Sequence, residues 1–192
     1  MSYFEEVSGQ MRRFSHVIAF DDCAFDRAGR GDVGLVGAVF AGGRLDGVLS
    51  GRVRRDGANS SPVMARMIFE SRFVEHVQLI MLQGIAVAGF NVVDVFELHA
   101  ATDLPILVVA RREPDLIAIQ KTLSLRIRGG DRKWRIIERL GGMERVGGVW
   151  IQRVGLTPEE SSAIVRRYAI NGNYPEPLRV VHLIASGVSG VT

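Results

Sequence analysis

The sequence has 192 residues, of which 47% are hydrophobic and 23% charged, and its formal net charge at pH 7 is +3. These values are ordinary for a globular protein, and the length allows one domain with a full core but excludes two large ones. The single cysteine, Cys23, excludes an intrachain disulfide and favours a reducing compartment.

The start of the chain and its hydropathy bear on localisation. Residues 1–13 lack the apolar core of a signal peptide, and no run of 18 apolar residues is present that could span a membrane. We therefore expect a cytoplasmic protein without a membrane partner.

Arginine supplies nearly all of the positive charge, because Lys121 and Lys133 are the only lysines. The planar guanidinium suits bidentate contacts with phosphates, which would fit a nucleic-acid partner. A genome rich in G and C would favour arginine equally well, so basicity alone does not identify the partner.

The first part of the sequence predicts three antiparallel strands. Residues 16–20 (HVIAF) are an apolar run typical of a buried strand. The runs 33–40 and 45–53 are separated by Ala41-Gly42-Gly43-Arg44, whose paired glycines favour the positive φ angles of a tight turn. These two runs therefore predict a β-hairpin.

Helices and covered strands alternate in the next part. A capping cluster at 59–62 (NSSP) predicts a helix over 63–73, and Asn91 is expected to cap a second helix that ends near residue 102. The apolar runs 77–82 and 105–110 predict strands covered on both faces. This order predicts a mixed sheet flanked by helices, in which these two strands run parallel to the first.

The C-terminal part predicts helices near 114–124 and 131–140 and a strand at 148–154. Thr157 and Glu160 form the sequence pattern of a capping box, and a last helix is expected to begin near Pro177. No internal repeat or linker divides the chain, so we predict a single domain over residues 1–192.

Two segments far apart in the chain carry the candidate chemistry. The first strand ends in the paired carboxylates Asp21 and Asp22, and the segment 174–182 (YPEPLRVVH) opens a helix that places His182 in its second turn. Together they would supply carboxylates and an imidazole to a divalent metal. Neighbouring side chains point to opposite faces of a strand, so we expect only one of the two aspartates to join the site unless the strand ends there.

With its segments in this order, the chain resembles the endonuclease V superfamily, and more closely the related endonuclease dU family, which is mostly archaeal. The resemblance implies an α/β, ribonuclease H-like fold in which carboxylates at strand ends hold Mg²⁺ or Mn²⁺ for phosphodiester hydrolysis. It is carried by IAFDDCAF (18–25), LDGVLSGRVRRDG (45–57), IMLQGIAVAGFNVVDVFELH (80–99), LPILVVARREPD (104–115) and YPEPLRVVHLIAS (174–186).

The resemblance implies catalytic roles for Asp21, as the first metal-binding aspartate, and for His182, as the active-site histidine. Asp22 and Gln83 are the further candidate metal ligands. Where endonuclease V has an aspartate in a pattern of the type L-D-G, this chain has Leu82-Gln83-Gly84. A neutral amide oxygen is a poorer ligand than a carboxylate for a hard dication. The glutamate of endonuclease V has no assigned counterpart, and Asp56 is the nearest acid.

The resemblance also implies a nucleic-acid partner, and DNA in particular. Gly84 opens the loop with which endonuclease V holds a deaminated base, but the characteristic H-P-R is replaced by Val87-Ala88-Gly89. Base recognition is therefore not carried over to this chain. The arginines at strand and helix ends are candidate phosphate contacts: Arg111, which replaces a lysine usual in endonuclease V, Arg112 and Arg179.

Other polar residues have structural explanations. His16, His76 and His99 are expected to be surface or packing residues, and Cys23 a small packing residue. Asp94 is expected at the third position of the helix capped by Asn91, where its charge favours the helix dipole.

Two kinds of function remain open. One is a metal-dependent endonuclease acting on DNA with deaminated bases, with catalysis weakened by Gln83. The other is a non-catalytic nucleic-acid-binding module or a regulatory protein on the same fold. The number of acids close to Asp21 distinguishes them, because two or more favour the enzyme whereas Gln83 alone favours the binding protein.

Overall fold

The computed structural model describes residues 13–26 and 31–188, so residues 1–12, most of the segment considered above for a signal peptide, lie outside the described residues. The described strands are β1 (His16–Asp22), β2 (Asp32–Ala41), β3 (Arg44–Arg54), β4 (Leu79–Gln83), β5 (Ala86–Val87), β6 (Asn91–Val92), β7 (Ile106–Ala110), β8 (Glu144–Val146) and β9 (Val149–Val154). The described helices are α2 (Ser60–Phe69), α3 (Val95–Thr102), α4 (Leu116–Arg126), α5 (Gly130–Leu140), α6 (Pro158–Tyr168) and α7 (Glu176–Val188).

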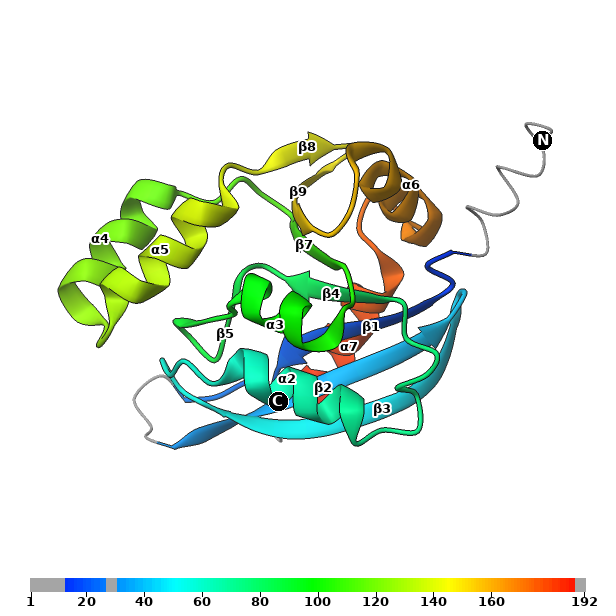
Figure 1. The fold of residues 1–192 in the computed structure, drawn as a ribbon, viewed down its shortest axis with the longest axis horizontal. Helices are drawn as coiled ribbons and strands as arrows, with labels where there is room; N and C mark the ends of the chain where they lie inside the picture. Colours follow the sequence, from blue (N-terminus) through cyan, green and yellow to red (C-terminus); the bar gives the residue numbers. More distant parts are fainter. Residues whose placement is uncertain (1–12, 27–30, 189–192) are drawn as a thin grey trace.

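A mixed sheet of seven strands, in the order β3-β2-β1-β4-β7-β9-β8, forms the centre of the molecule (Figure 1). β2 is antiparallel to β1 and β3, β4 runs parallel to β1, and β7 runs parallel to β4. The predicted mixed sheet and its strand directions are therefore confirmed. Beyond β7 the sheet continues with the antiparallel strands β9 and β8, of which the sequence predicted only β9.

Alternate residues of β1 belong to two cores, one on each face of the sheet. Ile18 and Phe20 pack in the core that also contains residues of α2 and α3, whereas Val17 and Ala19 pack in the core that contains residues of α6 and α7. All four side chains are fully buried, as the apolar run predicted. This alternation decides which layer each residue at the end of β1 meets.

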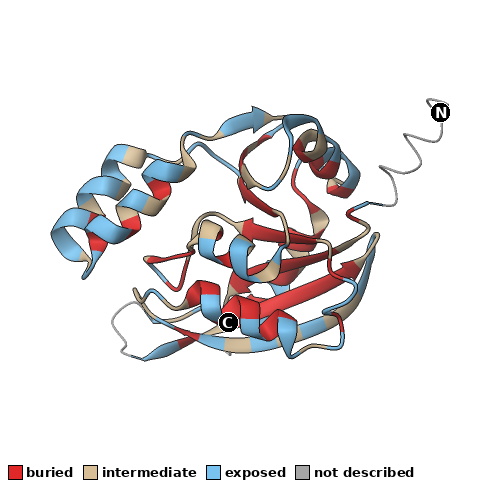
Figure 2. Cartoon of the chain, in the orientation of Figure 1, coloured by how far each residue is buried: buried red, intermediate tan, exposed pale blue. Residues whose placement is uncertain are grey.

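Helices α4 and α5 form a helical hairpin at one end of the molecule, to the side of the layers that cover the sheet (Figure 1). A small separate core lies between the hairpin and β6 and includes Leu123, Ile137 and Val92. Most of its surface is exposed (Figure 2). The hairpin is therefore joined to the rest of the molecule by a small core, and polar contacts contribute to holding it in place.

The predicted helix over 91–102 begins later than expected. α3 starts at Val95, and its N-cap is Asp94, whose carboxylate accepts the Glu97 amide. Asn91 is completely buried in β6, and its side-chain oxygen accepts the backbone N–H of Ser60, at the start of α2. The expectations that Asn91 caps this helix and that Asp94 is its third residue were therefore wrong, because a tertiary partner takes the asparagine side chain.

α2 also differs from the helix predicted over 63–73, since it begins at Ser60 and ends at Phe69. The capping box of α6 is confirmed, with both hydrogen bonds between Thr157 and Glu160 present.

In the part of the chain that the structure describes, no helix combines the length and the apolar character that crossing a bilayer requires.

Candidate functional site

A cavity of about 800 Å³ opens at the edge of the sheet where the parallel strands β1 and β4 end. Its walls come from the ends of these strands, the β5–β6 turn, the end of β3, α7 and the C-terminal part of α4. The residues that line it are Asp21, Asp22, Cys23, Ala24, Phe25, Arg55, Asp56, Gln83, Ala86, Ala88, Gly89, Phe90, Thr122, Arg126, Ile127, His182 and Ser186.

Asp21 and His182 meet at this cavity although 161 positions separate them in the chain. Nδ1 of His182 lies 2.7 Å from Oδ2 of Asp21, and the other oxygen of Asp21 accepts the Asp22 amide at 3.0 Å. Asp21 is 6% exposed, whereas half of the His182 side chain is accessible. The prediction that these two side chains converge is confirmed.

Burial raises the pKa of Asp21, and the hydrogen bond and charge of His182 only partly oppose this shift. The contact orients the imidazole, because a carboxylate at Nδ1 favours the tautomer in which this nitrogen carries the proton. Nε2 is then the nitrogen that can accept a proton.

Asp22 borders the same cavity from the other face of β1. Its carboxylate accepts the backbone N–H of Ala88 in the β5–β6 turn, which belongs to the α2–α3 side of the sheet. Burial and the neighbouring Asp21 charge raise the pKa of Asp22 to about 6. Because β1 ends at Asp22, the two aspartates border one cavity even though they belong to opposite faces.

Gln83 ends β4 next to Asp21, since Phe20 and Leu82 are paired in the parallel register. Its Oε1 accepts the hydroxyl of Tyr174 at 3.1 Å. The guanidinium of Arg111 lies over the Tyr174 ring, 3.9 Å from its centroid, and burial raises the pKa of that tyrosine well above its usual value. Gln83 thus lies beside the aspartates, with its amide oxygen engaged by a neighbouring side chain.

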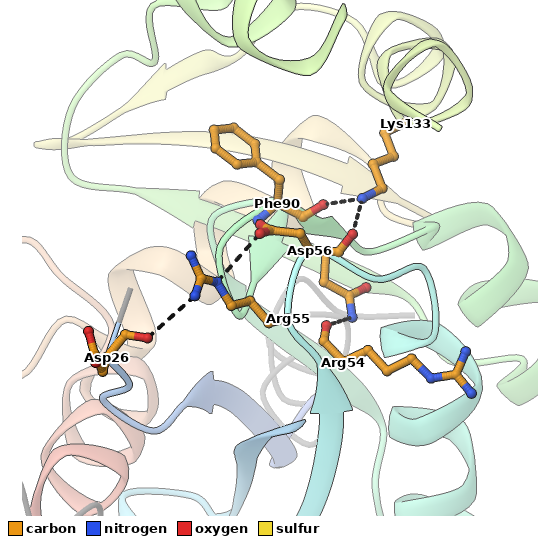
Figure 3. A network of polar contacts seen from close by, with 7 residues as sticks. Asp26, Arg54, Arg55, Asp56, Phe90 and Lys133 are labelled. Atoms are coloured by element: carbon orange, nitrogen blue, oxygen red, sulfur yellow. Dashed lines mark hydrogen bonds and ion pairs between the residues drawn. The ribbon is translucent and has the colours of Figure 1, made fainter. Parts of the chain in front are cut away.

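Asp56 also lines the cavity, but its carboxylate contacts Phe90 and Arg55 (Figure 3). Its carboxylate accepts the Phe90 amide at 2.7 Å and lies 3.5 Å from Nε of Arg55. Within residues 13–26 and 31–188, no group of three or more histidine, cysteine or acidic side chains is placed to hold a metal. A third carboxylate near Asp21 is therefore not found in these ranges.

The residues predicted to bind nucleic acid lie outside the cavity walls. Gly84, Arg111, Arg112 and Arg179 are not among its lining residues. Arg179 forms two hydrogen bonds with the carboxylate of Glu176, at 2.8 and 2.5 Å. Nucleic-acid binding by these four residues stays a prediction.

Several lining residues carry no signal that sequence reasoning could have used. Phe25, Arg55 and Phe90 come from three separate segments, and no motif links them. Arg126 belongs to a stretch rich in basic residues, which was the one available indication. The expected packing role of Cys23 agrees with its half-buried position against the α6–α7 core.

Comparison with known proteins assigns the chain to a family. The sequence model of the endonuclease dU family matches residues 13–189, which is most of the chain. The chain belongs to the endonuclease dU family. A UPF0215 protein of Deinococcus radiodurans is 52% identical over 177 residues, which cover 92% of this chain and 90% of that protein.

Solved structures place this member of the endonuclease dU family in a wider fold group. A protein of Archaeoglobus fulgidus superposes with a TM-score of 0.84 at 33% identity, covering 91% of this chain and 98% of the other. Endonuclease V of Ciona intestinalis, in complex with DNA containing an inosine, superposes with a TM-score of 0.54 at 11% identity, covering 95% of each chain. The fold is therefore that of endonuclease V, and the predicted ribonuclease H-like class is confirmed.

Proposed function

We propose that the protein binds nucleic acid and cleaves it as a metal-dependent endonuclease, with DNA containing deaminated bases as its substrate class. The observation that carries the proposal is the Asp21–His182 pair, which with Asp22 lines a cavity at the carboxyl ends of β1 and β4. The DNA-bound endonuclease V structure supports the choice of nucleic acid, since that protein has the same fold.

The chain's own donors fit a hard divalent cation. Mg²⁺ is commonly held by one or two carboxylates together with waters and substrate phosphates, and Asp21 and Asp22 both border the cavity. Gln83 would be a weak third donor, because its oxygen also accepts the Tyr174 hydroxyl. When bound, Mg²⁺ or Mn²⁺ would supply charge neutralisation and an activated water.

His182 would act on protons rather than on the cation. Its Nδ1 is bound to Asp21, so Nε2 is the atom that can take or return a proton near the phosphodiester. The half-exposed position of the ring allows a substrate to reach that atom. Asp21 therefore has two functions, to position the imidazole and to offer a carboxylate to the cavity.

A non-catalytic nucleic-acid-binding protein is the second candidate function. It is favoured by Gln83, a neutral residue engaged by Tyr174 next to Asp21, and by the lack of a third acid near the pair in the described ranges. Such a protein would retain the cavity and its surrounding cations without hydrolysing the strand.

A cleavage screen distinguishes the two. Uracil- and hypoxanthine-containing DNA, single- and double-stranded, would be incubated with Mg²⁺ or Mn²⁺ and the wild type, Asp21→Asn, His182→Gln or the control Asp103→Asn. Asp103 is exposed at the end of α3 with a φ of 57°, which asparagine adopts readily.

We expect cleavage by the wild type and the control, reduced at least 100-fold in Asp21→Asn and in His182→Gln, a loss typical of removing a general acid or base. Binding of DNA without cleavage by any form would support the second candidate. If the wild type neither bound nor cleaved DNA, this result would contradict both candidate functions.

A further inference from the structure

The α4–α5 hairpin concentrates the positive charge of the protein. Residues 116–140 contain seven arginines and lysines against two carboxylates, a net charge of +5, whereas the whole chain carries +3. The remainder of the chain has 17 cations against 19 carboxylates and is therefore net acidic. The basic character of this protein belongs to one structural element.

Three arginines at the closed end of the hairpin lie next to the candidate site. Arg126, in the last turn of α4, lines the cavity that also holds Asp21 and Asp22. Arg128 and Arg132 line an adjoining hollow of about 320 Å³, which Asp56 also borders. A strand of nucleic acid lying in the cavity would therefore pass beside these three side chains.

The three guanidinium groups are available to a ligand. All three residues are exposed, and within the described ranges none of them forms an ion pair or a side-chain hydrogen bond. Two other arginines of the hairpin have partners within the protein: Arg139 stacks over Phe96 at 3.8 Å, and Arg135 donates to the carbonyl oxygen of Asp131.

Lys133 fixes the position of these arginines relative to the site (Figure 3). It is 4% exposed, and its ammonium group donates to the carbonyl oxygens of Asp56 at 2.6 Å and Phe90 at 2.8 Å. Both acceptors border the cavity. Lys133 therefore anchors the closed end of the hairpin to the cavity wall before any ligand binds. This lowers the entropy that would be lost in ordering the hairpin on binding.

We propose that Arg126, Arg128 and Arg132 form a phosphate-binding surface that holds the nucleic-acid backbone flanking the reactive strand; this inference deepens the proposed function and rests on it. Arginine forks bind phosphate oxygens in a bidentate manner. An acidic protein is the alternative partner for such a surface.

The test measures how binding depends on salt, with EDTA present so that no cleavage is needed. A fluorescent 20-nucleotide DNA, single- or double-stranded, would be titrated with the wild type and with the triple variant Arg126→Gln/Arg128→Gln/Arg132→Gln. The matched control is Arg66→Gln/Arg145→Gln/Arg166→Gln, which removes the same charge from exposed positions that line neither hollow.

Each lost phosphate contact lowers the slope of log K against log salt by about 0.7–0.9, so we expect the triple variant to lose about 2–3 units of slope. At 0.1 M salt the same slope corresponds to an affinity loss on the order of 100-fold. The control variant should change the slope by less than about one unit. Circular dichroism of both variants would verify that the helices are retained.

Other outcomes overturn the inference in different ways. Equal losses in the triple and control variants would show that only net charge matters, and the proposed nuclease would stand without this surface. Wild-type binding of poly-glutamate as tight as that of DNA, with the same sensitivity to the triple variant, would assign the surface to an acidic protein. Absence of DNA binding by the wild type would overturn the proposed function together with the surface.

Discussion

At the C-terminal end of β1, two neighbouring carboxylates lie where their negative charge is disfavoured. Asp21 is nearly buried, and the pKa of both aspartates is raised, mainly by burial. A cation bound at the cavity would relieve this repulsion. The two residues therefore favour ligand binding over stability of the free protein.

Asp22→Asn is expected to stabilise the protein at neutral pH. Burial and the Asp21 charge raise the pKa of Asp22 from 3.8 to about 6, so the native state binds more protons than the unfolded chain between these values. Stability is therefore lost as pH rises through about 6, and the full penalty is present at pH 7.5. After discounting for partial exposure, we expect a gain of about 1–2 kcal/mol at pH 7.5.

Urea denaturation in EDTA at pH 7.5 and pH 4 would measure this effect, with Asp103→Asn as the control. The gain should be much smaller at pH 4, where the carboxylate is protonated in the native state and loses its penalty. An Asp22→Asn variant less stable than the wild type at pH 7.5 would contradict the expected repulsion.

Gln83 offers a second test at this scale. A carboxylate in place of its amide adds one negative charge facing a dication, worth roughly 1.5–3 kcal/mol after partial cancellation, or about one to two decades in affinity. We therefore expect Gln83→Asp to bind Mn²⁺ about 10- to 100-fold more tightly than the wild type, and the wild type to have weak nuclease activity at physiological Mg²⁺.

Calorimetric Mn²⁺ titration would compare wild type, Gln83→Asp and the neutral control Gln83→Ala. Equal affinities in the wild type and Gln83→Asp would show that this residue is not at the metal. Tight binding by the wild type would instead show that Asp21 and Asp22 suffice.

At the scale of elements, one buried lysine joins the α4–α5 hairpin to the cavity wall in addition to the small hydrophobic core. Burial lowers the pKa of Lys133, and its two carbonyl acceptors belong to the loop after β3 and to the β5–β6 turn. That turn is also held by the Asp56 carboxylate, through the Phe90 amide. One lysine thus connects three separate segments at the cavity wall.

Replacing this lysine should loosen the hairpin. Lys133→Met keeps the length of the side chain but leaves two partly buried carbonyl oxygens without their donor, at a cost of about 2–3 kcal/mol. Hydrogen exchange should show reduced protection in α4 and α5, with the central sheet unchanged. Lys121→Met, an exposed position on α4, is the control; protection in Lys133→Met equal to the wild type would contradict the anchoring role.

At the scale of the whole molecule, the order of the strands decides where the chemistry lies. β1 and β4 are adjacent and parallel, so their carboxyl ends and the residues that follow meet at one edge. α7 packs against β1 and β2, which brings His182 to Asp21. The basic hairpin then adds charge beside that edge, giving the protein a basic element next to an acidic site.

The sequence by itself determined the elements with strong local signals. The glycine turn of the β2–β3 hairpin, the apolar strands and the capping box at Thr157 each depend on residues a few positions apart, and all three were predicted correctly. The family resemblance predicted that Asp21 and His182 belong to one site, and the structure places them in contact.

Only the tertiary structure decided how the remaining polar side chains are used. Asn91 caps a helix that precedes it by 31 positions, Lys133 bonds to carbonyls 77 and 43 positions away, and Asp22 shares a cavity with Asp21 because β1 ends there. Local pattern could not foresee these contacts, because a buried polar group takes whichever partner the packed fold places within hydrogen-bond distance.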